Sequence, residues 1–376
     1  MNMNYFHKLV GFLLIFILNF LLADEPGDSL VWQGVHAFYN NETEIAIDIL
    51  TKARQEYPLN AAVHFTWASA VWLHSQANDP IEKTYEVLNR DLDEIIPLYE
   101  ILVEKYPDNP LYKLYLGSAE GLRARVYLGQ KRWFKTLIPA YLGFKITKAV
   151  GDKNPEIKDA MLPIGVVEYY VALRSSLLKW AASLFGLETT KEAGLDKMEI
   201  AASEGNFAKI EARSLLSFIY LWEAPNNAKA LKHSTILANQ YPKNFYFVLM
   251  YAESLIKTKK YDKALTILLQ LNKDFVDLTP TQKLQMKSYL DYEWGLYWFE
   301  KDNLVKSKKY AESSIKDYKA ELDIYLTNAL LLLGNVHDVI GNRKEAKSAY
   351  QKCIDLDNNS YAVELAKIYT DKPYKK

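Results

Sequence analysis

The sequence is short of the residues that would cross-link the fold or give it a strong charge. Among 376 residues there is one cysteine, so no disulfide can form within the chain. The 46 lysine and arginine residues equal the 46 aspartate and glutamate residues, and no net charge attracts a polyanion. We therefore expect no nucleic-acid partner. What is abundant is apolar surface, since 49% of the residues are hydrophobic and can form a core.

Sequence motifs of catalysis and metal binding are also missing. The six histidines include no pair four residues apart, the spacing that places two imidazoles on one helical face. No glycine-rich phosphate-binding loop, GxSxG or HExxH sequence is present. We expect a protein that is not an enzyme and that uses no metal or cofactor. An enzyme whose residues converge from distant segments ranks third among the interpretations below.

Residues 1–23 have the layout of a signal peptide. Lys8 precedes the mostly apolar run 9–23, and charge begins abruptly at Asp24. The run is shorter than the ~20 residues that a membrane-spanning helix needs. We expect cleavage after Ala23 and export to the periplasm or the outer membrane of a bacterium. The alternative is an uncleaved segment that anchors the protein in the inner membrane.

A fixed spacing of side-chain sizes recurs along the chain. A small residue is followed after 12, 4 and 3 positions by a small residue, a bulky residue and a third residue that is small in two of the three copies below and leucine in the other. The spacing occurs at Gly34, Ala46, Leu50 and Ala53, at Ala252, Ala264, Leu268 and Leu271, and at Gly334, Ala346, Tyr350 and Cys353. This pattern resembles the tetratricopeptide repeat family, whose unit is a pair of antiparallel helices.

The resemblance implies an all-α fold, a right-handed α-solenoid of about eight helix pairs over residues 24–376. The units between 61 and 206 are irregular, and 175–190 is expected to be an inserted amphipathic helix. Residues 360–370 are expected to form a capping helix. The middle region weakly resembles exported bacterial tetratricopeptide proteins of unassigned function. Cys353 occupies a close-packing position, so we expect a buried, inert thiol.

The resemblance also indicates which side chains face the concave groove, namely those at positions 2, 5, 9 and 12 of each first helix. Many of them are aromatic, which suits binding of an apolar or aromatic peptide segment of another protein. The candidate partner-binding residues are Phe38, Tyr169, Trp222, Tyr246, Tyr289, Tyr292, Leu296 and Phe299. We expect an interaction scaffold in the cell envelope. The alternative that the protein fills its own groove stays open.

Residues 121–150 carry seven basic side chains and no acidic one. They are Arg123, Arg125, Lys131, Arg132, Lys135, Lys145 and Lys148. One interpretation is internal pairing with the acidic segment 91–108. The other is contact with anionic lipid, because Trp133, Phe134 and Tyr141 accompany the cations. The second interpretation makes the protein a membrane-associated envelope assembly factor, our second-ranked function.

Overall fold

The computed structural model describes residues 25–376 except 131, 174–189, 317, 321 and 359, and it does not describe the Trp133 side chain. The signal peptide predicted at 1–23 lies outside the described residues, as does all but the last residue of the insertion predicted at 175–190. Within the described part of the chain all regular structure is helical, and no strand occurs.

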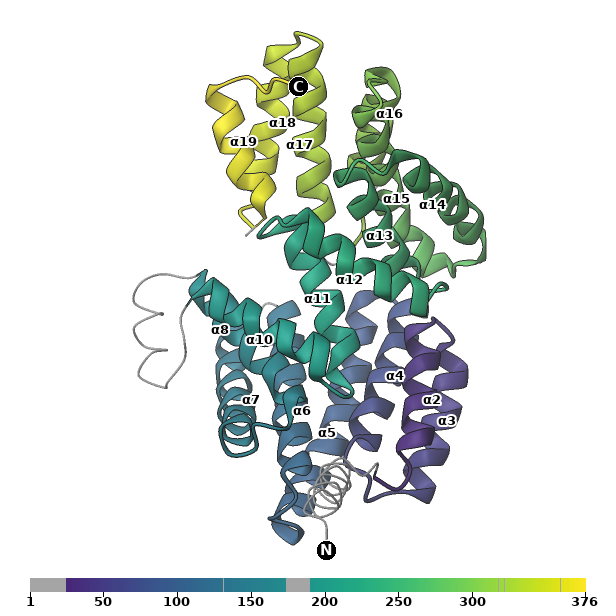
Figure 1. Ribbon diagram of the computed structural model, residues 1–376, viewed down its shortest axis with the longest axis vertical. Helices are drawn as coiled ribbons and strands as arrows, with labels where there is room; N and C mark the ends of the chain where they lie inside the picture. Colours follow the sequence, from purple (N-terminus) through teal and green to yellow (C-terminus); the bar gives the residue numbers. More distant parts are fainter. Residues whose placement is uncertain (1–24, 131, 174–189, 317, 321, 359) are drawn as a thin grey trace, which may run out of the picture.

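Seventeen α-helices are described, and they form eight pairs followed by a terminal helix (Figure 1). The pairs are α2 (Asp28–Tyr39) with α3 (Thr43–Glu56), α4 (Val63–Asn78) with α5 (Ile81–Lys105), α6 (Pro110–Gly129) with α7 (Trp133–Lys153), α8 (Met161–Ala172) with α10 (Lys191–Glu204), α11 (Ala208–Trp222) with α12 (Asn227–Gln240), α13 (Phe245–Lys257) with α14 (Tyr261–Asp274), α15 (Pro280–Glu300) with α16 (Leu304–Lys316), and α17 (Ile324–Val339) with α18 (Arg343–Asp355). The terminal helix is α19 (Tyr361–Asp371), and short 3-10 turns stand at Lys158–Ala160 and Phe275–Asp277. The prediction of an all-α solenoid with about eight helix pairs is confirmed.

The helix pairs cross closely where the sequence spacing places small residues. A Cβ atom added to Gly334 would lie 2.2 Å from the Tyr350 ring, and one added to Gly34 would lie 2.3 Å from Leu50 Cγ. In both of these pairs the glycine of the first helix therefore contacts the bulky side chain sixteen positions later. Such contacts are local in sequence, which explains why a repeated spacing was enough to predict the fold.

Cys353 is the small residue that follows Tyr350 in this packing. Its side chain is fully buried, and its Sγ lies 3.4 Å from the carbonyl oxygen of Thr327 in the facing helix. Burial raises the pKa of the thiol to about 12, so the nucleophilic thiolate is scarce at neutral pH. The structure thus places Cys353 in the close-packing position that the sequence indicates.

The solenoid also closes on itself, which the sequence pattern does not predict. We expected each unit to contact only its neighbours, yet α4 packs against α15. The loop between α12 and α13 and the start of α15 lie against the first units. Hydrogen bonds that span more than 200 residues join His36 Nδ1 to the Tyr241 hydroxyl (2.9 Å), Asn244 Nδ2 to the carbonyl of Tyr39 (2.8 Å), and Gln282 Nε2 to Asn41 Oδ1 (3.0 Å).

An ion pair supports the same contact, with Lys243 Nζ 2.6 Å from a Glu42 carboxylate oxygen. Trp32 stacks on Phe207, with ring centroids 4.5 Å apart, and so ties α2 to the residue preceding α11. Long-range contacts of this kind depend on the pitch of the whole superhelix. The first two units therefore lie beside the fifth to seventh units.

Candidate functional site

Most of the predicted groove residues are internal packing in this conformation. Six of the eight have between 0 and 7% of their surface exposed: Phe38, Tyr169, Trp222, Tyr289, Tyr292 and Phe299. The other two, Tyr246 and Leu296, are half-buried. A role of the six in partner binding stays a prediction, and it would require neighbouring helices to separate.

A tyrosine that the repeat positions did not single out fills the space between them. Tyr325, at the start of α17, is fully buried and stacks on Tyr289, with ring centroids 3.8 Å apart and an interplanar angle of 17°. Its ring also contacts Trp222, with centroids 4.8 Å apart, and Tyr292 at 5.6 Å. Helices α11, α15 and α17 therefore share one aromatic cluster. Sequence reasoning missed Tyr325 because it precedes the groove positions of its repeat.

A buried carboxylate lies beside this cluster. Glu253 of α13 accepts hydrogen bonds from Trp222 Nε1 at 2.8 Å and from the Tyr292 hydroxyl at 3.2 Å. Lys257, one turn further along α13, places its Nζ 2.8 Å from the same carboxylate. The ion pair and the two donors offset the cost of burying the charge. Two predicted partner-binding residues, Trp222 and Tyr292, thus have an internal hydrogen-bond acceptor.

Glu293 of α15 is the second buried acid at this place. It is fully buried, and neither of its carboxyl oxygens receives a hydrogen bond from the described residues. Burial and the neighbouring Glu253 carboxylate raise the pKa of Glu293 well above its ordinary value. Perturbed carboxyl pairs occur in active sites. Here both acids are 0% exposed, so no substrate can reach them in this conformation.

Beside the aromatic cluster lies a group of tyrosines and carboxylates that are not fully buried. The Tyr39 hydroxyl lies 3.3 Å from Glu211, and the Tyr170 hydroxyl lies 3.4 Å from Glu223. Burial raises the pKa of Tyr246, and the nearby charge of Glu211 raises it further. Tyr246 therefore lies close to this acid. We call these five residues, from α2, α8, α11, α13 and the residue after α11, the inner acidic surface.

Both acids of the inner acidic surface have raised pKa values. Glu211 is exposed, yet the protein around it removes enough water to raise its pKa. Burial raises the pKa of Glu223 to about 7, against hydrogen bonds and the Lys191 charge, which lower it. One carboxylate oxygen of Glu223 is buried and has no hydrogen-bond partner among the described residues. These carboxylates would therefore be stabilised by a cation that a ligand brings to them.

The basic stretch 121–150 divides between the two interpretations. In α6, Arg123 pairs with Asp93 at 2.8 Å, as the interpretation of internal pairing expects. Arg125 instead lies over the Trp72 ring, 4.7 Å from its centroid. At the end of α7, Lys148 pairs with Asp152 at 2.8 Å.

The remaining cations behave differently. Arg132, Lys135 and Lys145 are exposed and form no ion pair with any described residue, although Lys145 lies 5.9 Å from the Tyr141 ring. Lys131 lies outside the described residues.

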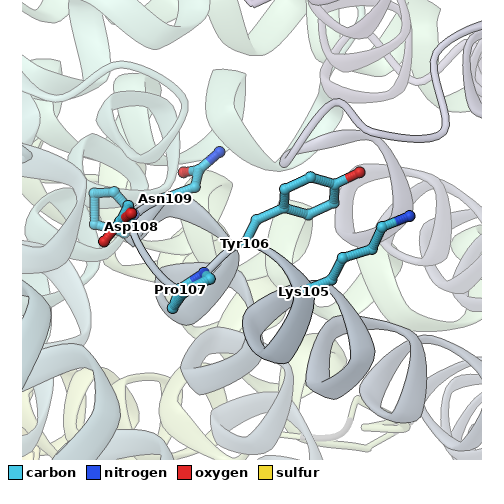
Figure 2. A pocket seen from close by; sticks show the side chains of 6 residues that line it. Lys105, Tyr106, Pro107, Asp108 and Asn109 are labelled. Atoms are coloured by element: carbon cyan, nitrogen blue, oxygen red, sulfur yellow. The ribbon is translucent and has the colours of Figure 1, made fainter.

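Other features of the described residues offer no assembled chemistry. A surface hollow at the turn between α5 and α6 is lined by the six consecutive residues 105–110, and Figure 2 shows Lys105 and Asp108 on opposite sides of it. No three histidine, cysteine, aspartate or glutamate side chains in the described part of the chain gather as a metal site. None of the described helices is both long enough and apolar enough to cross a membrane.

Comparison with known proteins identifies one repeat directly. A family model described as Tetratricopeptide repeat matches residues 328–360, which contain most of α17 and all of α18. A search of curated protein sequences gives no match.

Solved structures of similar fold include a tetratricopeptide repeat protein from Parabacteroides merdae, at 11% identity and a TM-score of 0.33, with 92% of this chain and 97% of that chain covered. They also include NprR in complex with its cognate peptide NprX, at 12% identity and 0.43, covering 91% and 81%. A third is the human IFIT1 dimer with PPP-AAAA, at 11% and 0.42, covering 92% and 84%. These similarities are too low to transfer a ligand. The family model thus identifies residues 328–360 as a tetratricopeptide repeat, and the described helix pairs along the rest of the chain form an α-solenoid of the same kind.

Proposed function

We propose that this protein is a non-catalytic interaction scaffold of the bacterial cell envelope, which holds a segment of another protein on its inner acidic surface. In tetratricopeptide solenoids the side chains of the repeated spacing pack between helices, and the concave side remains available for ligands. The envelope location rests on the signal-peptide layout of residues 1–23.

The observation that carries the proposal is the contrast between the two parts of the concave side. The aromatic cluster around Tyr325 is closed by the protein's own side chains, whereas Tyr39, Tyr170 and Tyr246 are only partly buried. Tyrosines supply large, rigid contact area together with a hydroxyl that can bond a peptide backbone. Glu211 and Glu223 stand among them with raised pKa values. The partner segment is therefore expected to combine apolar side chains with a lysine or arginine.

Site-specific crosslinking tests this proposal. A photoreactive amino acid at Tyr246 should capture a defined partner in intact cells, while the same group at Leu269, which is 50% exposed on α14, should not. Glu223→Gln in the crosslinking protein should reduce the yield, because the amide cannot pair with a cation. Equal capture at both positions, or none at Tyr246, would contradict the proposal. Cell fractionation tests the location separately, and recovery from the cytoplasm would refute it.

A further inference from the structure

Helix α7 exposes a continuous stripe of large apolar side chains. Phe134 is 89% exposed, Ile138 70% and Leu137 65%, and Tyr141 and Leu142 complete the α7 apolar stripe. The five residues follow the spacing 3, 1, 3 and 1, so they share one face of the helix. Single exposed apolar residues are common, but a stripe of this extent marks an interaction surface.

The opposite face of α7 is fixed by α6, so the stripe cannot turn inward. A Cβ atom added to Gly143 would lie 2.7 Å from the carbonyl oxygen of Gly117 in α6, which shows how closely the two backbones approach. Phe144 and Val150 are buried on the side of α7 that packs into the fold. Figure 1 shows α7 at an edge of the molecule, with α6 between it and α5. The packing of α7 against α6 therefore keeps the α7 apolar stripe on the outside of the molecule.

Unpaired cations accompany the stripe. Arg132 and Lys135 stand in its first turn and Lys145 follows its end, and all three are exposed without an ion pair to a described residue. Neighbouring basic residues such as Arg123 and Lys148 do have acidic partners. The surface around the stripe is therefore selectively positive, although the chain as a whole is neutral.

This charge decides between possible occupants of the stripe. A second copy of the protein docking the same face would bring like charges together. Residues 174–189 contain one arginine, one lysine and one glutamate, so that segment offers no net negative charge to match. An anionic bilayer surface supplies both the apolar layer and the opposite charge.

We propose that α7 docks on the surface of an anionic membrane. The helix lies in the plane of the interface, with Phe134, Leu137 and Ile138 among the upper acyl chains. Arg132 and Lys135 meet the lipid phosphates. The contact uses a different surface from the inner acidic surface, so the scaffold can hold a partner segment while it rests on the membrane.

Vesicle flotation of the chain that begins at Asp24 tests the proposal without the apolar run of residues 1–23. The described core begins at Leu30, so this chain retains all of it. Vesicles of phosphatidylglycerol and phosphatidylcholine in equal parts should bind the protein at low salt, and pure phosphatidylcholine should not. Arg132→Glu with Lys135→Glu should weaken binding by at least about 30-fold, because each cation near an anionic surface contributes ~1 kcal/mol.

The apolar contribution has its own variant and control. Phe134→Ser with Ile138→Ser should weaken binding by at least about 100-fold, since two large side chains no longer leave water. Val305→Ser, at a residue 83% exposed on α16, should bind as the parent does. All variants should keep the parent's melting temperature because their side chains are exposed. The proposal would be overturned if the parent did not float, or if it floated equally well with neutral vesicles. It would also be overturned if Val305→Ser lost as much binding as Phe134→Ser with Ile138→Ser. A concentration-dependent dimer that Phe134→Ser with Ile138→Ser abolishes would overturn it as well.

Discussion

Replacing Tyr292 with alanine should destabilise the fold itself. The Tyr292 ring is 3% exposed, contacts Tyr325, and donates its hydroxyl to Glu253 at 3.2 Å. Removing a buried aromatic ring costs ~3 to 5 kcal/mol. The lost donor adds ~1 kcal/mol or more, because Glu253 remains buried with one partner fewer. We therefore expect Tyr292→Ala to lose at least ~4 kcal/mol in the free energy of unfolding.

Two further variants make this measurement specific. Tyr292→Phe keeps the ring and removes the hydroxyl, so it should lose only ~1 to 3 kcal/mol. Phe134→Ala removes a ring that is 89% exposed and should change stability by less than ~0.5 kcal/mol. Urea unfolding followed by circular dichroism measures all three. If Tyr292→Ala were as stable as Phe134→Ala, the Tyr292 ring would not be internal packing and the groove would be open at this point.

Three other predictions concern acid titration, the thiol and the helix crossing. The folded pKa of Glu223 is about 7, above its ordinary 4.5, so its stabilising contribution is complete below pH 4.5 and is lost as the pH rises through 7. Glu223→Gln should remove up to ~3 kcal/mol of this pH dependence, less for solvent screening; a free energy of unfolding with the same pH profile in Glu223→Gln as in the parent would contradict the assignment. Cys353 should resist iodoacetamide in the native protein and tolerate alanine better than leucine, which would overpack its site by ~1 to 3 kcal/mol; rapid native labelling would refute the packing role. Gly334→Ala should lose ~1 to 3 kcal/mol because its Cβ meets Tyr350, whereas Gly121→Ala, with open space around it, should be neutral or stabilising, and unfolding curves that show no difference would contradict the close crossing.

The sequence predicts the helix pairs well because their packing is local. The spacing that joins Gly334 to Tyr350 and Cys353 reflects contacts within one unit, and the same contact recurs between Gly34 and Leu50. The prediction that Arg123 is paired within the acidic neighbourhood also follows from adjacent helices. Interactions within a unit leave a regular trace in the sequence, and sequence analysis recovers them.

The concave side could not be predicted in the same way. Whether Tyr289 faces a partner or Tyr325 depends on how far α15 and α17 rotate against one another, and no single unit encodes that angle. The contact of Tyr241 with His36 depends on the pitch accumulated over several units. Glu253 and Glu293 could have attracted notice as lone acids in otherwise apolar helices, since buried charges need partners. Which basic side chains of residues 121–150 are paired and which are unpaired could be decided only from the exposure of each side chain in the structure.

Closure of the solenoid is the central claim, because it brings Tyr39 of α2 to Glu211 of α11 and so assembles the inner acidic surface. Double electron–electron resonance between spin labels at Ile45→Cys on α3 and Leu284→Cys on α15, in a Cys353→Ala background, measures it most directly. Both positions are more than half exposed, so labels should not disturb packing. The account predicts a single narrow distribution, centred at a short distance between the two labels. A broad distribution at long distance would show that the first units are separate from α15, and would contradict the account.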